Sequence, residues 1–254
     1  MKTIKPRLFE CLISDASARP FEGWGFSRIS SRWKHERLPW DYGQIVRQAI
    51  AGTKSLLDLG TGGGENLSRL SPLPPETRAT ESYQPNIPVA RARLEPLGVP
   101  VTQVRDHAAL PFEDGRFDTV IDRHEEFVAG EVYRVLRPGG RFITQQVGER
   151  NGSEINDWIE GRPVFGSFTL ALALAQLAEA GLEVADHREA LLKTSFYDVG
   201  ALVYYLRAVP WQIERFNIES YRERHAMVHN HIQNVGELSV TNHRMYIDAV
   251  KPVV

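Results

Sequence analysis

The stretch that most constrains the fold of this chain is Leu56–Glu65, which reads LLDLGTGGGE. An apolar run ends abruptly at glycines in positions 60, 62 and 64, and residues 66–70 have the character of an opening helix. An apolar run of this kind before a glycine-rich turn predicts a buried parallel strand that ends in a tight loop. Glycine permits positive φ and leaves room for a ligand against the backbone, because it has no Cβ. Since ligands of open α/β sheets bind beyond the carboxyl ends of the strands, the loop is predicted to be a ligand site.

Glu65 indicates which kind of ligand the loop can hold. A dinucleotide-binding loop reads G-x-G-x-x-G/A and seats the pyrophosphate on the amides of the following helix. Glu65 stands where the third small residue should be, and a carboxylate in the first helical turn would repel a pyrophosphate. This disfavours a nicotinamide oxidoreductase and predicts a ligand without phosphate at this point. S-adenosylmethionine, with its adenosine, amino-acid tail and positive sulfonium, meets that condition.

The same loop resembles motif I of the class I S-adenosylmethionine-dependent methyltransferases, in the form D-x-G-x-G-x-G. The match is position for position at Asp58, Gly60, Gly62 and Gly64. The resemblance implies S-adenosylmethionine as the cofactor, bound by these four residues and by Thr61 between them.

A second acidic residue follows at the spacing expected for a ribose contact. Residues 78–82 are predicted to form a short strand, and Glu81 follows Asp58 at close to the ~20-residue interval typical of such a carboxylate. A carboxylate can accept two hydrogen bonds from the vicinal diol of a ribose. By resemblance Glu81 is the family's acidic residue after the second strand, with Ser82 beside it in the cofactor site. The alternative is a surface glutamate at a strand end.

Two further stretches carry the resemblance. Residues 106–118 read DHAALPFEDGRFD and are similar to the family's D-x-x-x-L-P-F-x-D-x-x-F-D. This similarity implies that Asp106 binds the adenine amino group and that His107 offers its backbone amide to a ring nitrogen. Residues 131–140 read EVYRVLRPGG and resemble the family's E-x-x-R-V-L-R-P-G-G, which implies a helix and then a turn at Pro138–Gly140.

The residues after the predicted fourth strand are candidates for chemistry, because the family places groups near the methyl donor there. They read Asp122-Arg123-His124-Glu125-Glu126. His124 is the candidate catalytic base, since a histidine with a pKa of about 6.5 is largely neutral at pH 7. A base is not required if the acceptor is already nucleophilic. Arg123 is predicted to contact the cofactor, and the two glutamates are expected to begin the next helix and complement its dipole.

Composition sets wider limits. The 254 residues suit one α/β domain with an added cap, and a net charge of −2 gives no sign of a surface made for nucleic acid. The single cysteine, Cys11, excludes an internal disulfide and a zinc-finger arrangement. No apolar run reaches the ~18 residues of a membrane span, and the first residues lack the apolar centre of a signal peptide. These features predict a cytoplasmic protein without a membrane partner.

The sequence predicts a single methyltransferase domain, 1–254, with additions around its core. Residues 53–195 and 239–254 form the predicted Rossmann-like core, and residues 196–238 a helical cap insertion. Residues 1–52 hold three of the five tryptophans, Trp24, Trp33 and Trp40, and are expected to form either an aromatic lid or a cluster at the sheet edge.

Three histidines near the end of the insertion, His225, His229 and His231, invite a metal interpretation. The first two are four residues apart, but no HExxH motif is present, so a solvated helix and no metal site are predicted.

The resemblance implies a three-layer α/β/α sandwich around a mostly parallel seven-stranded sheet of order 3-2-1-4-5-7-6, with strand 7 antiparallel. The predicted reaction is methyl transfer from S-adenosylmethionine to a small-molecule acceptor, most similar to the ubiquinone/menaquinone-biosynthesis branch. Two alternatives stay open: an RNA-modifying methyltransferase that uses the basic residues between Arg28 and Arg37, and a non-catalytic cofactor-binding member of the fold.

Overall fold

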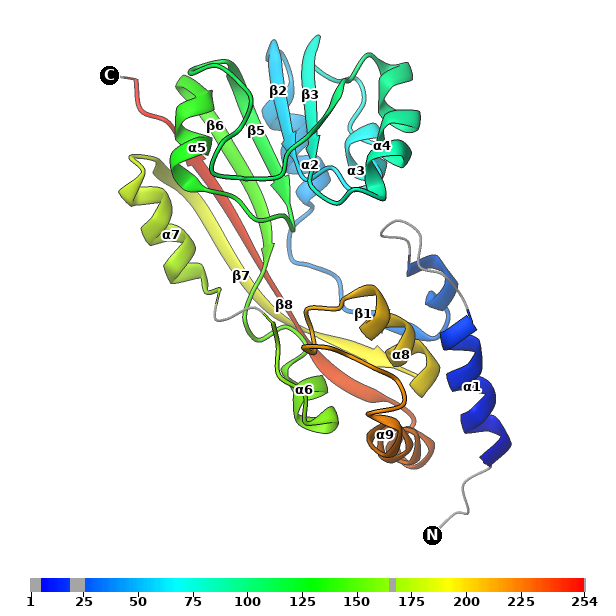
Figure 1. Ribbon diagram of the computed structural model, residues 1–254. Coiled ribbons are helices and arrows are strands. Elements are labelled where there is room, and N and C mark those ends of the chain that lie inside the picture. Colours follow the sequence, from blue (N-terminus) through cyan, green and yellow to red (C-terminus); the bar gives the residue numbers. More distant parts are fainter. Residues whose placement is uncertain (1–5, 19–25, 165–167, 254) are drawn as a thin grey trace. The chain divides into compact units, whose positions relative to one another are not determined.

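The computed structural model describes residues 6–18, 26–164 and 168–253 of the chain. The chain forms two compact units, whose elements can be followed in Figure 1. We call them the helical unit, made of Met1–Leu38, Gly148–Phe168 and Ala190–His243, and the sheet unit, made of Pro39–Val147, Thr169–Glu189 and Arg244–Val254. Two long strands, β7 (Glu183–Phe196) and β8 (Leu238–Val250), contribute residues to both units.

The sheet unit has the predicted Rossmann-like topology. Its other strands are β2 (Ser55–Leu59), β3 (Glu76–Glu81), β4 (Val101–Gln103), β5 (Phe117–Arg123) and β6 (Leu136–Val147). The strands lie in the order β4-β3-β2-β5-β6-β8-β7, which is 3-2-1-4-5-7-6 when they are counted from β2. β2 pairs in parallel with β3 and β5, β5 pairs in parallel with β6, and β8 is antiparallel to β6. The predicted fold class and the antiparallel last strand are therefore confirmed.

Among the described residues the sheet has eight strands, one more than predicted. The additional strand β1 (Trp33–His35) pairs antiparallel with the Thr194–Phe196 end of β7, within the helical unit. Three residues are too few to show an alternating hydrophobic pattern, so only pairing with a distant segment reveals the strand.

The helices of the sheet unit are α2 (Tyr42–Ile50), α3 (Glu65–Ser68), α4 (Asn86–Leu94) with the 3₁₀ helix η2 (Glu95–Leu97), α5 (Ala129–Val135) and α7 (Leu170–Glu179). Two of them, α2 and α7, begin at a residue whose side chain caps the helix. The Asp41 carboxylate accepts from the Gln44 amide at 2.9 Å, and the Thr169 hydroxyl accepts from the Leu172 amide at 3.1 Å. Such caps satisfy amides that have no partner in the first helical turn.

Two local predictions in the sheet unit are wrong. Glu125 and Glu126 do not begin a helix, because α5 starts only at Ala129. The predicted turn at Pro138–Gly140 is instead part of β6: Phe117 pairs with Leu136, and the register then shifts through a bulge. A bulge accommodates the extra residues without ending the strand.

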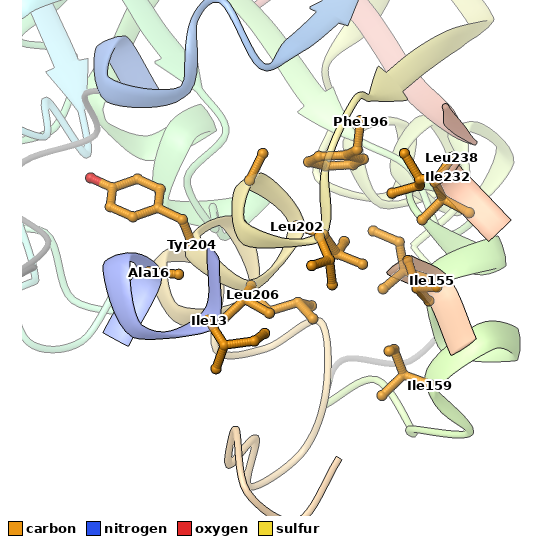
Figure 2. Packing of buried hydrophobic residues seen from close by; sticks show 14 of the residues in the cluster. Ile13, Ala16, Ile155, Ile159, Phe196, Leu202, Tyr204, Leu206, Ile232 and Leu238 are labelled. Atoms are coloured by element: carbon orange, nitrogen blue, oxygen red, sulfur yellow. The ribbon is translucent and has the colours of Figure 1, made fainter. Parts of the chain in front are cut away.

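The helical unit is built around α8 (Val199–Ala208), which is apolar on nearly all sides and buried accordingly. Its other elements are α1 (Pro6–Ala18), the 3₁₀ helix η1 (Phe26–Ile29), α6 (Ser153–Ile159) and α9 (Arg222–Val235). Figure 2 shows the apolar cluster formed by α1, α6, α8, α9 and the ends of β7 and β8, with Leu202 and Leu206 in its interior.

The expectation of a solvated α9 is wrong for one face of the helix. His225 and His229 are 0% and 1% exposed, and they share the buried face with Val228 and Ile232 at helical spacing. Phe216 lies 5.8 Å from the His225 ring centroid. The sequence misled because histidine counts as polar, whereas here it occupies two core positions.

The three N-terminal tryptophans do not form one described cluster. Trp33 packs against Phe26 in the helical unit, at 4.9 Å between ring centroids, and Trp40 packs against Tyr246 in the sheet unit, at 6.2 Å. Trp24 lies outside the described residues. The aromatic lid therefore stays a prediction.

Candidate active site

The glycine loop after β2 is held in place by β3. The Thr61 amide donates to the Thr80 carbonyl at 2.8 Å, and the Gly60 amide donates to the Thr80 hydroxyl at 3.2 Å. Gly60 and Gly64 have φ of 62° and 79°. A Cβ on Gly64 would lie 2.7 Å from Leu94 Cγ. Both the backbone conformation and the close packing therefore require glycine.

Two carboxylates are buried beside this loop, one from each of two adjacent parallel strands. Asp58 on β2 is 7% exposed and Glu81 at the end of β3 is 2% exposed. The Tyr83 amide donates to Glu81 Oε1 at 2.7 Å, and the Gly62 amide also faces this carboxylate. Burial raises the pKa of Asp58 to about 7, against an opposing effect of Thr61, and the Glu81 charge adds to the rise. Burial likewise raises the pKa of Glu81.

Thr61 itself is 6% exposed, and its hydroxyl makes no full hydrogen bond to any described residue. It lies close enough to Asp58 to lower the pKa of that carboxyl, but the hydroxyl does not meet hydrogen-bond geometry. A buried hydroxyl without a partner is uncommon in folded proteins. It leaves a donor and acceptor at the loop for a ligand.

The loop after β4 brings a third group of predicted residues to the site. Asp106 is exposed and caps its own turn, accepting from the Ala108 amide at 2.8 Å. His107 Nε2 lies 3.1 Å from Glu125 Oε1, and this hydrogen bond raises the pKa of His107. The Ser82 hydroxyl donates to the same Glu125 oxygen at 3.2 Å. Ser82, from the end of β3, and His107 therefore meet at one carboxylate.

Glu125 is the site residue that the sequence did not identify. A Cβ on Gly60 would lie 2.3 Å from Glu125 Cγ, so the side chain covers the loop where a cofactor is expected. The local cause is Asp122, whose Oδ1 accepts from the Glu125 amide at 3.1 Å and turns the chain directly after β5. The spacing of Asp122 and Glu125, three residues apart, was the sequence signal for this contact. A glutamate shortly before a helix is more commonly explained by its interaction with the helix dipole.

Asp122 is the most deeply buried acid of the site. It is 0% exposed, and its Oδ1 also accepts from Gln146 Nε2 at 3.1 Å. Its Oδ2 has no hydrogen-bond partner among the described residues. Burial raises the pKa of Asp122 well above its ordinary value, and the charges of Glu125 and Asp58 add to this effect.

Arg123 and His124 close the carboxyl end of β5. Arg123 Nη1 donates to Asn66 Oδ1 at 2.6 Å, which links β5 to the helix after the glycine loop. His124 has a φ of 68°, a left-handed conformation that costs about 1–2 kcal/mol for a residue with a Cβ. Desolvation by neighbouring side chains, and then the charges of Arg244 and Arg123, lower the pKa of His124 well below its ordinary value, although the residue is exposed.

Taken together, the site gathers four acidic side chains, of which Asp58, Glu81 and Asp122 are buried. Burial raises the pKa of each of these three carboxyl groups, and their interactions with one another and with Glu125 add to the rise. A bound cation would favour the ionised form of each carboxyl group, whereas a bound anion would oppose it. The arrangement suits a cationic ligand and disfavours a phosphate.

The role given to Glu65 needs correction. Its carboxylate is paired with the Arg93 guanidinium of α4, which also donates to the Gly63 carbonyl. The Glu65 charge is therefore partly neutralised and repels an anion less than the sequence suggested. A pyrophosphate is disfavoured instead by the buried acidic side chains. The helix on which it would be seated, α3, also has only four residues.

Within residues 6–18, 26–164 and 168–253, no group of three or more His, Cys, Asp or Glu side chains is placed to hold a metal ion. None of the described helices combines the length and apolar character that crossing a bilayer requires.

Strand order, glycine loop and acids at the ends of β2 and β3 define a Rossmann-like fold of the class I methyltransferase type. Residues 57–144 match the family described as a methyltransferase domain, a range that includes Asp58, Glu81, Asp106 and His124. This match confirms the resemblance inferred from the sequence over that segment.

Individual relatives agree with the fold. A demethylmenaquinone methyltransferase of Thermus thermophilus is 37% identical over 100 residues, covering 35% of this chain and 46% of the relative. The chain spans less than half the length of the curated relatives it matches. A Bacillus halodurans protein provisionally named a methyltransferase superposes with a TM-score of 0.63 at 22% identity, covering 84% of this chain and 99% of the other. The [4+2]-cyclase SpnF superposes with a TM-score of 0.56 at 18% identity, covering 97% and 93%.

Proposed function

We propose that this chain transfers a methyl group from S-adenosylmethionine to a small-molecule acceptor and releases S-adenosylhomocysteine. The observation that carries the proposal is the pair of buried carboxylates, Asp58 and Glu81, beside a glycine loop with positive φ. S-adenosylmethionine brings a sulfonium and an ammonium, which suit a site with several buried carboxyl groups. A nicotinamide dinucleotide would bring a pyrophosphate of the wrong sign.

Each predicted cofactor residue has a place in this proposal. Glu81 holds the ribose diol, Asp106 the adenine amino group, and His107 offers its backbone amide to the adenine ring. The remaining contacts come from the loop and its neighbours: Asp58, Gly60, Thr61, Gly62, Gly64, Ser82 and Arg123. The reaction is an in-line displacement at the methyl carbon, so the main contribution of the protein is to position the two reactants.

A small-molecule acceptor is supported by the Thermus relative, whose name gives demethylmenaquinone as its acceptor. The match covers only 35% of this chain, so it supports the cofactor chemistry more strongly than the identity of the acceptor. We place acceptor specificity in the insertion 196–238. The net charge of −2 continues to disfavour an RNA substrate.

One observation favours a second function. SpnF is named a cyclase, and it covers nearly the whole of this chain. A fold shared at 18% identity does not fix the reaction, so the second candidate is a cofactor-binding member of the fold that transfers no methyl group.

Calorimetry tests the proposal without knowledge of the acceptor. S-adenosylmethionine and S-adenosylhomocysteine should each bind the full chain, and NAD should not. Tight NAD binding with no response to either S-adenosyl compound would overturn the assignment. Release of S-adenosylhomocysteine during a screen of phenolic and quinol acceptors would then separate methyl transfer from cofactor binding alone.

A further inference from the structure

Three side chains of the sheet unit form a hydrogen-bonded chain that ends at His124. The Trp40 indole Nε1 donates to Gln145 Oε1 at 2.9 Å, and Gln145 Nε2 lies 3.1 Å from His124 Nε2. Trp40 is 6% exposed and Gln145 is 1% exposed, so two of the three groups are shielded from water. The backbone repeats the connection, because the His124 amide donates to the Gln145 carbonyl at 2.9 Å.

The chemistry of the three groups fixes the direction of every hydrogen bond. An indole N–H can only donate, so the atom of Gln145 that faces Trp40 has to be the carbonyl oxygen. The amide NH₂ of Gln145 then faces His124, and it can only donate as well. His124 Nε2 is therefore an acceptor without a proton, and a neutral ring carries its proton on Nδ1.

The surroundings of His124 favour this neutral form. The charged groups that act on the ring include the guanidinium groups of Arg123, the last residue of β5, and of Arg244, on β8. Both repel an imidazolium. Among the described residues Nδ1 has no hydrogen-bond partner, so its N–H is available to a ligand.

We propose that Trp40 and Gln145 are positioning residues that hold His124 as the neutral Nδ1–H tautomer, so that His124 presents a hydrogen-bond donor rather than a base. The lone pair of Nε2 is occupied by Gln145, and Nδ1 already carries a proton. This role differs from the catalytic base expected from the sequence. Resting on the proposed function, it also names the acceptor class: a molecule that places a carbonyl or oxyanion oxygen at Nδ1 and is nucleophilic without losing a proton to His124.

Long-range ¹H–¹⁵N spectra of the full chain labelled with ¹⁵N-histidine report the tautomer directly. His124→Gln identifies the signal by its loss. In the parent we expect a protonated Nδ1, an unprotonated Nε2 and no titration between pH 6 and 8. An Nε2–H tautomer, or titration near pH 6.5, would overturn the proposal.

Two variants test the positioning role. In Gln145→Glu both carboxylate oxygens accept, so His124 should protonate at Nε2 and begin to titrate within the same pH range. In Trp40→Phe the ring stays but the N–H is lost, which frees the Gln145 amide to turn and should give a mixture of tautomers. Gln103→Glu, at the edge strand β4, is the control and should leave the His124 signal unchanged. An unchanged His124 tautomer in both test variants would show that Gln145 and Trp40 do not position the ring.

The spectra need neither cofactor nor acceptor. A negative cofactor titration would overturn the proposed function while leaving the tautomer result intact, so the two failures are distinguishable.

Discussion

Glu81 combines a structural and a proposed binding role in one carboxylate. It accepts from the Tyr83 amide at 2.7 Å, which shapes the loop after β3, and it retains lone pairs for a ribose diol. A hydrogen bond to a charged group contributes about 1.5–3 kcal/mol. Loss of the carboxylate should therefore affect cofactor binding more than it affects the fold.

Glu81→Ala should weaken S-adenosylhomocysteine binding by at least ~10-fold, since about 1.4 kcal/mol corresponds to one decade. Glu81→Gln keeps one acceptor oxygen and should lose less. Glu76→Ala, at the exposed start of the same strand, is the matched control. Equal affinities in all four proteins, measured by calorimetry, would show that Glu81 does not bind the cofactor.

Gly60→Ala tests the loop at a single residue. The new alanine would have to keep the φ of 62° that Gly60 has. Its Cβ would lie 2.3 Å from Glu125 Cγ, so the Glu125 side chain has to move. The left-handed conformation alone costs about 1–2 kcal/mol. We expect a destabilised protein with weakened cofactor binding, whereas Gly130→Ala, in the open helix α5, should be neutral or stabilising. Urea unfolding with parallel titrations checks both, and an unaffected Gly60→Ala would contradict the close packing.

At the scale of elements, the helix caps allow a graded comparison. Asp198 caps α8 by accepting from the Ala201 amide at 2.9 Å, and it also binds Arg32 Nε at 2.7 Å. Thr169 caps α7 without an ion pair. Asp198 therefore supports an ion pair as well as a helix terminus, whereas Thr169 supports a helix terminus alone.

Asp198→Ala should lower the free energy of unfolding by about 2–3 kcal/mol, because it removes a cap of about 1 kcal/mol and leaves Arg32 without its nearest carboxylate. Asp198→Asn keeps the capping oxygen and should cost less. Thr169→Ala should cost about 1 kcal/mol. Urea unfolding of each variant gives these values, and equal costs for Asp198→Ala and Thr169→Ala would show that the ion pair contributes nothing.

At the scale of the whole molecule, the two units should respond to pH in opposite directions. In the helical unit, burial lowers the pKa of His225 to about 4, compared with about 6.5 in an unfolded chain. Between these values the unfolded state binds more protons, so the stability of this unit falls as the pH drops from about 6.5. In the sheet unit, the raised pKa of Asp58, about 7, means that the folded state takes up a proton first and gains stability over the same range.

Hydrogen exchange measured by mass spectrometry at pH values from 7 to 4.5 resolves the two units. After correction for intrinsic rates, peptides from α8 and α9 should lose protection on acidification, by up to about 3 kcal/mol for a shift of this size. His225→Phe should flatten this dependence, and His187→Gln, at an exposed position, should not. Protection of α9 that is independent of pH in the parent would refute the prediction.

The sequence, through its resemblance to the methyltransferase family, predicted the strand order, and it named most of the residues proposed for the site. Asp58, the glycine loop, Glu81 and Asp106 were found because each must stand at a fixed place after a strand, and such places are local in the chain. A cap residue such as Asp41 can be predicted from the sequence for the same reason, since a cap acts within one helical turn.

Only the tertiary structure decided what depends on distant partners. β1 exists because it pairs with β7, and His225 and His229 are buried because α9 packs on the apolar cluster of the helical unit. Glu125 enters the site because Asp122 turns the chain after β5, and His124 is held by Gln145 and Trp40, the latter 84 residues away. A sequence shows which groups can donate or accept. Which partner each one meets, and therefore which nitrogen of His124 carries the proton, is fixed only when the strands are side by side.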